Sequence, residues 1–579
     1  MRAASCGRTT TGSVVDGRRR RSRICVRPGP AKHGERMLTS REWPSCSSAP
    51  LTRMMSLGDI LLEGALQHGE RTALWADGVR LSYRELVERA ARLAGTLVAA
   101  QLAGPARRCA VLGARSIGAF TGVAAAALAR SAWVPLNPRH PAERLAHVAH
   151  AAEVDALVID EQSDALAGEL LARLDRPLHV FLPDRSSPPD WARRLPQHVF
   201  LCRGDLAPPV LDGLGGGRPD DGAYLLFTSG STGAPKGVLV RQANVMAYLA
   251  SAFDRYRPTA DDRFTQLFDL TFDLSVHDMF LCWKSGGALF CVPDRARMAP
   301  GEFVRRHDLS FWFSVPSVAM IMARLRMLQP DALPSLRWSL FCGEALPRRI
   351  AEVWAEAAPN SVVENLYGPT EATIAITAFR LPANPAAIAR LPEIVPIGAP
   401  LPGQQARVIM ADGAPAVTGM DGELYLGGSQ VAEGYWRRPD LTVERFSPPA
   451  DATEPPRWYR TGDRAMVSEE HGLIFLGRLD RQIKLGGHRV ELQEVEVALR
   501  RAAATDSVAA IASPLDSLGL PKGITAFVTE DSLDSEAILA ACRATLPPYM
   551  VPFRVYRVAE WPVNDNGKTD YAALRRMTE

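Results

Sequence analysis

The feature that most constrains this chain is a regular alternation of short apolar segments with longer segments of helical periodicity. Apolar spacing predicts helices over residues 60–68 and 83–99, whereas residues 108–112 and 132–136 have the pattern of short buried strands. Strands separated by helices of this length favour parallel sheets covered by helices. The alternation continues to about residue 475, so we expect an α/β fold built from parallel or mixed sheets.

Chain length and composition limit the protein class. With 579 residues the chain is too long for one hydrophobic core, because cores stop growing at roughly 250–300 residues. Hydrophobic residues make up 47% and charged residues 23%, which excludes a disordered or fibrous chain. The net charge of +3 gives no overall field that would attract nucleic acid.

Cysteine usage and hydropathy favour a cytoplasmic enzyme. The nine cysteines are scattered, odd in number and without a C-x-x-C pair, which is typical of a reducing compartment and gives no zinc site. The longest apolar run, residues 117–128, is shorter than the ~18 residues of a membrane helix and stops before Arg130. We expect it to form an Ala-rich buried helix and expect no membrane span.

The pattern divides the chain into three parts. Residues 1–53 carry Arg18 to Arg21 and little apolar periodicity, so we interpret them as a disordered or wrongly assigned N-terminal extension, with a transit peptide as the alternative. Residues 55–477 form the predicted large N-terminal core. Residues 478–579 form a predicted small α+β domain, in which a strand near Arg489 is followed by the predicted elements 493–504 (helix), 508–512 (strand) and 535–545 (helix).

The most informative local motif is a buried strand that runs into a loop rich in Gly, Ser and Thr. The strand covers residues 224–228, and the loop donors are Thr228, Ser229, Gly230, Ser231, Thr232 and Gly233, followed by Lys236. Glycines let the backbone approach a ligand and direct its N–H groups inward, and one lysine adds a compact cation. The spacing differs from a Walker A loop. The motif therefore predicts a phosphate-binding loop of another type.

This loop resembles the phosphate loop of the adenylate-forming superfamily, and further motifs follow in that family's order. The matching segments cover about residues 57–575 and are 134–138 (VPLNP), 272–275 (FDLS), 343–345 (GEA), 365–371 (NLYGPTE), 422–424 (GEL), 434–435 (GY), 438–439 (RP), 459–463 (YRTGD), 477–480 (GRLD), Gln482, Lys484, Arg489, Glu491, 546–552 (LPPYMVP) and 566–568 (NGK). Within the superfamily, FDLSV and FCGE resemble D-alanine–carrier-protein ligases, and WFSVPS with FCGE resembles prolyl-carrier-protein ligases. The two subclasses are not separated at this level.

The resemblance implies a fold and a reaction. It implies a large multi-subdomain N-terminal domain and a small mobile C-terminal domain. The reaction is attack of a carboxylate on the α-phosphorus of ATP with Mg²⁺, which gives an acyl-adenylate and pyrophosphate.

The resemblance also implies roles for the nucleotide-binding residues. The 228–236 loop holds the β- and γ-phosphates, Thr370 contacts the α-phosphate, and Glu371 is the Mg²⁺ ligand. Tyr367 and Asn365 contact adenine, and Asp463 accepts hydrogen bonds from the ribose hydroxyls. The remaining implied contacts are Gly343, Glu344 and Ala345 along adenine and Arg478 at the sugar or phosphate.

Two residues near the C-terminus receive mechanistic roles from the resemblance. Lys568 bridges the reacting carboxylate and the α-phosphate and stabilises the charge that develops between them. Asp480 is the hinge about which the small domain rotates between adenylation and thioester formation. The chain has Gly486 where many relatives carry arginine, so the contacts of that loop are left open.

Asp273 defines the substrate class that the resemblance implies. In amino-acid-activating relatives this aspartate pairs with the α-ammonium group of the substrate. The other expected pocket walls are mostly apolar and offer no charge, and they are Leu274, His277, Ser314, Leu340, Cys342, Leu366, Ile374 and Ala375. A small neutral amino acid is therefore expected, such as alanine of either hand, proline, serine or cysteine.

The chain ends eleven residues after Lys568, so we expect the acceptor to be a separate phosphopantetheinyl carrier protein. Three alternatives stay open at this point. They are an acyl- or aryl-CoA ligase, a luciferase-type oxidoreductase, and a catalytically inactive module that binds a carrier protein.

Overall fold

A computed structural model describes residues 56–105, 107–230, 235–297, 299–450, 452, 457–516, 519–529, 534–563 and 569–578. The predicted N-terminal extension, the loop residues Ser231, Thr232 and Gly233, and Lys568 lie outside these described residues.

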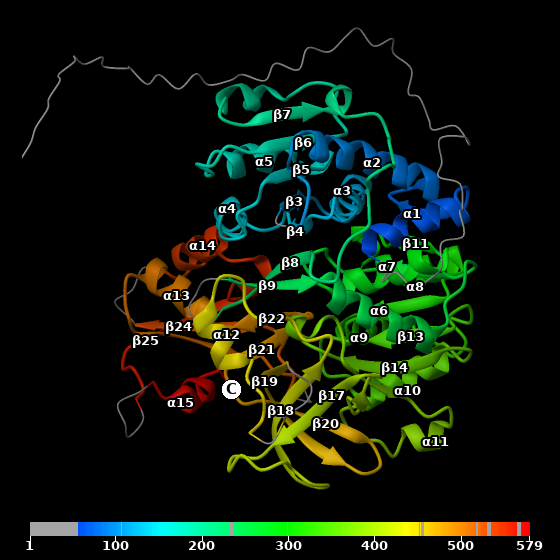
Figure 1. The fold of residues 1–579 in the computed structure, drawn as a ribbon. Helices are drawn as coiled ribbons and strands as arrows, with labels where there is room; N and C mark the ends of the chain where they lie inside the picture. The colour runs from blue at the N-terminus through cyan, green and yellow to red at the C-terminus, as the bar shows by residue number, and fades with distance from the viewer. Residues whose placement is uncertain are drawn as a thin grey trace, which may run out of the picture.

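A seven-stranded sheet forms the upper part of the molecule in Figure 1. Its strands are parallel except for the antiparallel pair β8–β9, and helices cover both faces. In sheet order the strands are β7 (Val199–Cys202), β6 (His179–Leu182), β5 (Ala156–Ile159), β3 (Arg108–Leu112), β4 (Ala132–Leu136), β8 (Gly222–Thr228) and β9 (Lys236–Arg241).

A nine-stranded sheet forms the second half of the large domain. Its central strands are parallel, with antiparallel pairs at both edges. In sheet order the strands are β16 (Ala399–Pro400), β15 (Thr377–Arg380), β14 (Val362–Tyr367), β13 (Trp338–Phe341), β12 (Phe311–Ser314), β10 (Arg263–Gln266), β11 (Ala288–Cys291), β1 (Thr72–Ala76) and β2 (Val79–Ser82).

The helices begin where the sequence provides caps. Ser82 and Glu85 form a capping box at the start of the helix 83–99, and Ser56 and Asp59 do the same one helix earlier. The helices of the large domain are α1 (Leu57–His68), α2 (Tyr83–Ala99), α3 (Ile117–Leu128), α4 (Ala142–Ala151), α5 (Asp164–Leu171), α6 (Gln242–Tyr256), α7 (Leu274–Ser285), α8 (Gly301–His307), α9 (Pro316–Arg324), α10 (Arg348–Ala357), α11 (Pro385–Ile388) and α12 (Pro439–Arg445). Short 3-10 turns are η1 (Glu161–Ser163), η2 (Asp190–Arg194), η3 (Arg203–Asp205), η4 (Asp294–Ala296), η5 (Thr370–Ala372) and η6 (Pro548–Met550).

The largest core joins the two sheets. It contains buried residues of α1, α2, α3 and α7 together with strands of both sheets, and a separate core lies on the far face of each sheet. The buried, Ala-rich α3 confirms the sequence interpretation of this segment, because eleven of its twelve residues are buried. No helix in the described part of the chain is long and apolar enough to cross a membrane.

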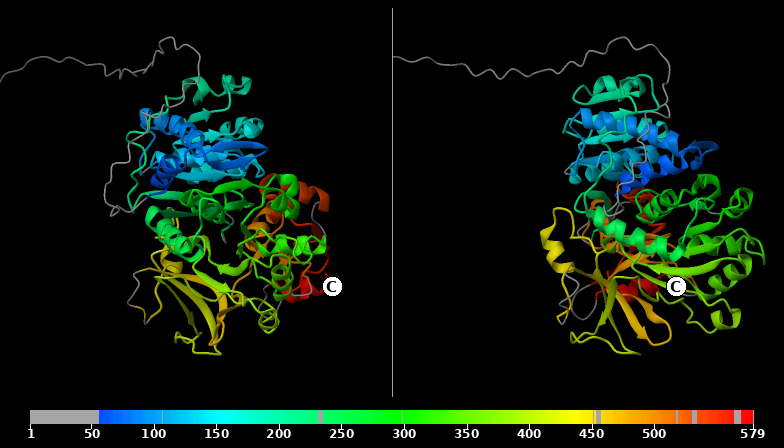
Figure 2. Two further views of the ribbon diagram at one scale, coloured as in Figure 1. Left: turned by 90° about the vertical axis from the view of Figure 1, so that its right-hand side faces the viewer. Right: turned by 45° about the vertical axis from the view of Figure 1, so that its right-hand side comes forward.

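A third, antiparallel sheet and the C-terminal elements complete the fold (Figures 1 and 2). The third sheet consists of β17 (Gln404–Ile409), β18 (Asp421–Gly428), β19 (Trp458–Ser468) and β20 (Gly472–Arg478). The C-terminal elements are the hairpin β21 (Gln482–Leu485) and β22 (His488–Glu491), the sheet β23 (Val508–Ala512), β24 (Ile524–Thr529) and β25 (Arg554–Val558), and the helices α13 (Leu492–Ala503), α14 (Ser535–Thr545) and α15 (Tyr571–Arg576).

The C-terminal elements have hydrophobic cores of their own. One cluster is made of buried residues at positions between Val490 and Val555. The smaller cluster consists of Ala509, Ile511, Phe527, Val558 and Leu574. Between β20 and β21 the chain passes through Leu479, Asp480 and Arg481. We propose that the two domains meet at this short connection.

Candidate active site

The predicted site residues gather at the carboxyl ends of neighbouring strands. The strands β10, β12, β13 and β14 are parallel, so the segments that follow them emerge at one edge of the sheet. The segment after β10 carries Asp273, the segment after β13 carries Cys342 and Gly343, and the segment after β14 carries Thr370. A ligand site at this edge is the usual arrangement in open α/β sheets.

The phosphate-loop motif lies between β8 and β9 as predicted. Thr228 pairs with Lys236 across these strands, which returns the lysine to the base of the loop. The Ser229 hydroxyl donates to the backbone carbonyl of Arg489 at 2.7 Å, and Gly230 N–H points to Glu494 Oε2 at 3.4 Å. Both partners belong to the C-terminal domain, so this domain contacts the loop directly.

Lys236 is buried in a small polar cluster. Its ammonium group lies 3.3 Å from the Tyr435 hydroxyl and 3.9 Å from Glu371 Oε1. Burial and the nearby Arg489 guanidinium lower the pKa of Lys236 to about 8, against the opposing effect of Glu371. A desolvated cation at this point is suited to bind a phosphate group.

Glu371 is fully buried and lies at the centre of this cluster. Its Oε1 accepts hydrogen bonds from the hydroxyls of Tyr435 at 2.7 Å and Tyr459 at 3.0 Å. Arg489 Nη1 lies 3.2 Å from Glu371 Oε2. Burial alone would raise the pKa of this carboxyl, but Arg489 and Lys236 together outweigh it and lower the pKa to about 2.

The residues predicted to bind adenine surround one small cavity. Gly343, Glu344, Ala345, Asn365 and Tyr367 all line it. The amide nitrogen of Asn365 donates to the carbonyls of Val395 and Pro396, whereas its buried Oδ1 has no partner among the described residues. An unused amide oxygen in a slot beside an aromatic ring fits the exocyclic amine of a purine.

Asp463 and Arg478 form the predicted sugar site. Asp463 accepts hydrogen bonds from the Tyr367 hydroxyl and from Arg478 Nη1, the latter at 2.6 Å. Arg478 also donates from Nε to Asp480 Oδ1 at 2.9 Å. The predicted hinge residue is therefore linked by one guanidinium to the predicted ribose ligand.

Asp273 is buried at the start of α7. Its Oδ2 accepts a hydrogen bond from the N–H of Ile374 at 2.9 Å. Asp273 also lines a cavity of about 140 Å³, here called the inner cavity, whose lining includes Thr228, Thr370 and His488. Burial raises the pKa of Asp273 to about 6, although the hydrogen bond from Ile374 lowers it in part. A buried carboxylate beside a cavity is suited to pair with an ammonium group.

The structure separates the predicted walls of the amino-acid pocket into two groups. Leu274 and Cys342 line the inner cavity with Asp273. The others are buried and are not part of its lining, and they are His277, Leu340, Leu366, Ile374 and Ala375. Of these, Leu366 lines the small cavity at Asn365 and Tyr367.

Ser314 lines a second cavity beside the inner one, together with Phe272. Its hydroxyl accepts from Trp312 Nε1 at 3.0 Å and donates to the Val315 carbonyl at 3.0 Å. Successive side chains on a strand point to opposite faces, so Phe313 is on the other face of β12, where its ring contacts His277. Phe313 therefore packs against His277 of α7, and Ser314 lies on the opposite face of the strand.

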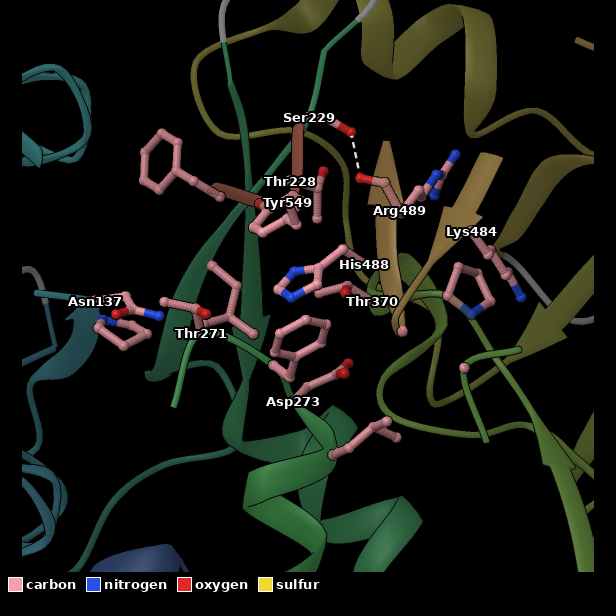
Figure 3. Close-up of a pocket in the computed structure, with 18 of the residues that line it drawn as sticks. Asn137, Thr228, Ser229, Thr271, Asp273, Thr370, Lys484, His488, Arg489 and Tyr549 are labelled. Atoms are coloured by element: carbon pink, nitrogen blue, oxygen red, sulfur yellow. Dashed lines mark hydrogen bonds between the residues drawn. The ribbon is translucent and has the colours of Figure 1, made fainter. Parts of the chain in front are cut away.

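The β21–β22 hairpin fills much of the cleft. Figure 3 shows the His488 ring between Tyr549 and Thr370, above Asp273. The ring stacks on Tyr549 at 3.5 Å between centroids and meets the edge of Phe272 at 4.6 Å. His488 lines both the inner cavity and an outer cavity of about 810 Å³, so it separates the two.

A Mg²⁺ ion fits this site only with the help of substrate phosphates. The described residues contain no group of three acidic, His or Cys side chains that would hold a metal ion by themselves. Mg²⁺ commonly uses one or two carboxylates together with phosphate oxygens, and Glu371 is suitably placed for that role. Its present partner, Arg489, would have to leave first.

Several side chains at the site have no role that the sequence alone indicates. Tyr435, Tyr459 and Arg489 belong to recognised motifs, but their common target, Glu371, is 64 to 118 residues away along the chain. Phe313 follows two other aromatic residues in β12, so the sequence gives no alternation that would show on which face of the strand it lies.

The class of protein follows from a comparison with known families. The family described as AMP-binding enzyme matches residues 61–436, and the chain belongs to this family. The resemblance to the adenylate-forming superfamily and the predicted α/β fold are both confirmed.

Individual relatives share the same architecture. The L-proline–[L-prolyl-carrier protein] ligase of Pseudomonas fluorescens is 31% identical over 91% of this chain and 100% of its own length. The crystal structure of the Vibrio cholerae adenylation domain AlmE with glycyl-adenosine-5'-phosphate has a TM-score of 0.82, 32% identity and coverage of 92% of this chain and 99% of AlmE.

Other relatives are much longer than this chain. The dimodular nonribosomal peptide synthase of Bacillus subtilis is 31% identical over 91% of this chain, but the chain spans only 21% of that protein. The chain therefore corresponds to one part of such a synthase.

Proposed function

We propose that this protein activates a small neutral amino acid with ATP as an aminoacyl-adenylate and transfers it to the phosphopantetheine thiol of a separate carrier protein. The observation that carries the proposal is the buried Asp273 beside the inner cavity, with Thr370 on the same wall. An unpaired buried ammonium is costly, so this carboxylate selects for substrates with an α-amino group.

The nucleotide would occupy the slot around Asn365 and Tyr367, with its ribose at Asp463. The phosphates would reach Lys236 and the loop after β8, and Glu371 would hold Mg²⁺ with the phosphate oxygens. The ion would neutralise phosphate charge during attack by the carboxylate. The prolyl-carrier-protein ligase relative and the glycyl-adenylate bound to AlmE support an amino acid as the substrate.

The hairpin arrangement supports a domain movement between the half-reactions. The Arg489 guanidinium hydrogen-bonds the Glu371 carboxylate, and the Lys484 ammonium lies 5.4 Å from the centre of the Tyr367 ring. The Arg489 contact competes with Mg²⁺ at Glu371, whereas Lys484 lies at the adenine slot, which is occupied in both half-reactions. We therefore assign this arrangement to the thioester-forming stage and place the hinge at Asp480.

The outer cavity is the proposed route for the thiol-bearing arm of the carrier protein. It borders the inner cavity, because His488 lines both. The thiol sulfur would attack the acyl carbon of the adenylate, the bond to the phosphate oxygen would break, and AMP would leave. The thiol proton would go to solvent.

The test of the proposed function is amino-acid-dependent ATP–pyrophosphate exchange by the wild type and by Asp273→Ala. We expect exchange with small neutral amino acids, and a rise of two to three orders of magnitude in amino-acid KM in the variant, because an ammonium left unpaired costs about 3–5 kcal/mol. An unchanged KM, or activity only with acids that lack an amine and with free coenzyme A, would instead identify an acyl- or aryl-CoA ligase.

A further inference from the structure

We propose that a cavity between α2 and α3, separate from the active site, binds a free α-amino acid with an apolar side chain of medium size. This inference goes beyond the proposed function and does not depend on it. The amino acid would bridge two opposite charges, Arg89 and Asp184, that line the same cavity. We call this space the α2–α3 cavity.

The α2–α3 cavity has a volume of about 310 Å³ and lies at the carboxyl edge of a parallel sheet. It is lined by α2, by the first turns of α3 and by the segments that follow β6 and β7, all in the upper part of the molecule in Figure 1. The strands β3, β5, β6 and β7 are parallel, so α3 and these segments begin at one edge, which is the usual place for a ligand in such a sheet. None of the described residues that line it also lines the inner cavity, the outer cavity or the adenine slot.

Asp184 follows β6, and its carboxylate lies against the first turn of α3. Position 118 is glycine, and a Cβ atom there would be 2.9 Å from Asp184 Oδ2. No described residue donates a hydrogen bond to this carboxylate, whereas the backbone carbonyl of Asp184 accepts one from Arg203 Nη2 at 2.8 Å. Burial and the nearby Glu161 raise the pKa of Asp184, against the opposing effect of Arg89 and Arg203. Such a partly compensated carboxylate is suited to pair with an ammonium group.

Arg89 supplies the opposite charge from α2, at the exposed rim of the cavity. Within the described part of the chain its guanidinium group makes no hydrogen bond and no ion pair. The other two arginines of the lining have backbone partners, because Arg92 donates to the carbonyl of Arg203 at 3.4 Å and Arg203 donates to the carbonyl of Asp184. Arg89 is therefore the guanidinium left to bind a carboxylate, a group that its paired N–H donors match.

The mixture of charges favours a zwitterion over a simple ion. An anion such as inorganic phosphate would meet Arg89, but it would also face Asp184 and the buried Glu88, which repel it. A metal ion has no ligand set here, because no group of three acidic, His or Cys side chains that could hold one occurs in the part of the chain that the structure describes. An α-amino acid presents a carboxylate to Arg89 and an ammonium group to Asp184.

The rest of the lining favours an apolar side chain on the ligand. Ile117, Pro183, Leu206 and Pro209 form apolar walls beside the two charges. The α2–α3 cavity has more than twice the volume of the inner cavity. Leucine is therefore a suitable probe, because it is larger than the small amino acids that are proposed for the active site.

The first test measures the binding of leucine to the whole protein by isothermal titration calorimetry without ATP. Two analogues each lack one charge of leucine, since 4-methylpentanoate has no ammonium group and 3-methylbutylamine has no carboxylate. We expect leucine to bind and each analogue to bind at least tenfold more weakly, the usual effect of losing one charged hydrogen-bonding partner. Failure of leucine to bind, or equal binding of leucine and 4-methylpentanoate, would overturn the proposal.

The second test uses Arg89→Gln and Asp184→Asn, with Arg173→Gln and Asp175→Asn as matched controls. Arg173 and Asp175 are exposed in the same half of the protein and do not line the cavity. We expect each cavity variant to weaken leucine binding at least tenfold and each control to leave it unchanged. Because Arg89 is exposed, Arg89→Gln is expected to keep the wild-type melting temperature, so its result stands even if Asp184→Asn is destabilised. Unchanged leucine binding in Arg89→Gln would contradict the proposal.

The variant Asp273→Asn separates the α2–α3 cavity from the active site. We expect it to bind leucine as the wild type does. Loss of leucine binding in Asp273→Asn, with normal binding in Arg89→Gln and Asp184→Asn, would place leucine in the active site and overturn the proposal. The two proposals fail separately, because leucine binding through Arg89 and Asp184 stands even if no amino acid supports pyrophosphate exchange, and exchange can occur in a protein that does not bind leucine.

Discussion

Arg489 Nη1 lies 3.2 Å from Glu371 Oε2, so a guanidinium group from the C-terminal domain occupies the carboxylate that is proposed to hold Mg²⁺. Arg489 Nε also donates a hydrogen bond to Gln482 Oε1 of the same hairpin at 2.7 Å. We propose that metal binding and hairpin insertion exclude each other at Glu371. This buried carboxylate would then link the position of the C-terminal elements to the stage of the reaction.

We predict that Arg489→Ala slows thioester formation about tenfold or more and changes pyrophosphate exchange less than threefold. The inserted hairpin loses its partner for a buried charge, whereas the Mg²⁺-bound state does not use Arg489. Rapid-quench measurement of both half-reactions checks this prediction. The exposed Arg500→Ala serves as the control variant, and equal losses in the two half-reactions of Arg489→Ala would refute the linkage.

The pKa of Asp273 predicts a pH dependence of amino-acid binding. Its pKa in the folded protein is raised from 3.8 to about 6, so its contribution to stability is fully present below pH 3.8 and is lost as pH rises through about 6. Binding has the opposite sign, because only the ionised carboxylate pairs with an ammonium group. We expect amino-acid KM to rise up to tenfold per pH unit below pH 6.

The control measurement is the KM for ATP over the same pH range, because Asp273 is not proposed to contact ATP. In Asp273→Asn the rise in amino-acid KM below pH 6 is expected to disappear. A wild-type amino-acid KM that stays constant between pH 5 and pH 7 would show that Asp273 is not the ammonium partner.

Asn365 provides a test of the adenine slot. Its buried Oδ1 has no partner in the described structure, whereas its amide nitrogen is bound by two carbonyls. We predict that Asn365→Ala raises the KM for ATP about tenfold, the cost of one hydrogen bond to a purine amine. The KM for GTP, which lacks this amine, should change little. Loss of ATP selectivity is the diagnostic result, and an unchanged ATP-to-GTP ratio counts against the assignment.

Lys568 lies outside the described residues, and its role stays a prediction from the resemblance. We expect Lys568→Ala to lower adenylation at least ~10²-fold, the usual effect of losing one charge contact made in the transition state. Transfer from chemically prepared aminoacyl-adenylate to the carrier protein should be affected far less. Near-normal pyrophosphate exchange by the variant would remove Lys568 from the adenylation step.

Local patterns predict much of the fold. The predicted strands 108–112, 132–136 and 508–512 and the helices 83–99 and 535–545 have the bounds of β3, β4, β23, α2 and α14. The bounds of these segments can be predicted because caps and uniform apolar spacing define them within a few residues. The motif residues around Asp273, Gly343 and Thr370 also converge, since parallel strands deliver them to one edge.

Contacts between distant segments cannot be predicted from local patterns. Nothing near Glu371 in the chain indicates that Tyr435, Tyr459 and Arg489 share it, because each comes from another element. On β12 the four consecutive buried residues give no periodicity, so the sequence does not show that Phe313 packs against His277.

Identification of the enzyme-bound product after a single turnover tests most directly whether this protein activates a small amino acid. The wild type is incubated with Mg²⁺-ATP and an equimolar mixture of all proteinogenic amino acids and D-alanine, and the bound small molecule is released and weighed by high-resolution mass spectrometry. We expect the adenylate of a small neutral amino acid together with one equivalent of pyrophosphate. Recovery of unreacted ATP alone from this mixture, with an adenylate formed only when an acid lacking an amino group is supplied, would contradict an amino acid as the substrate.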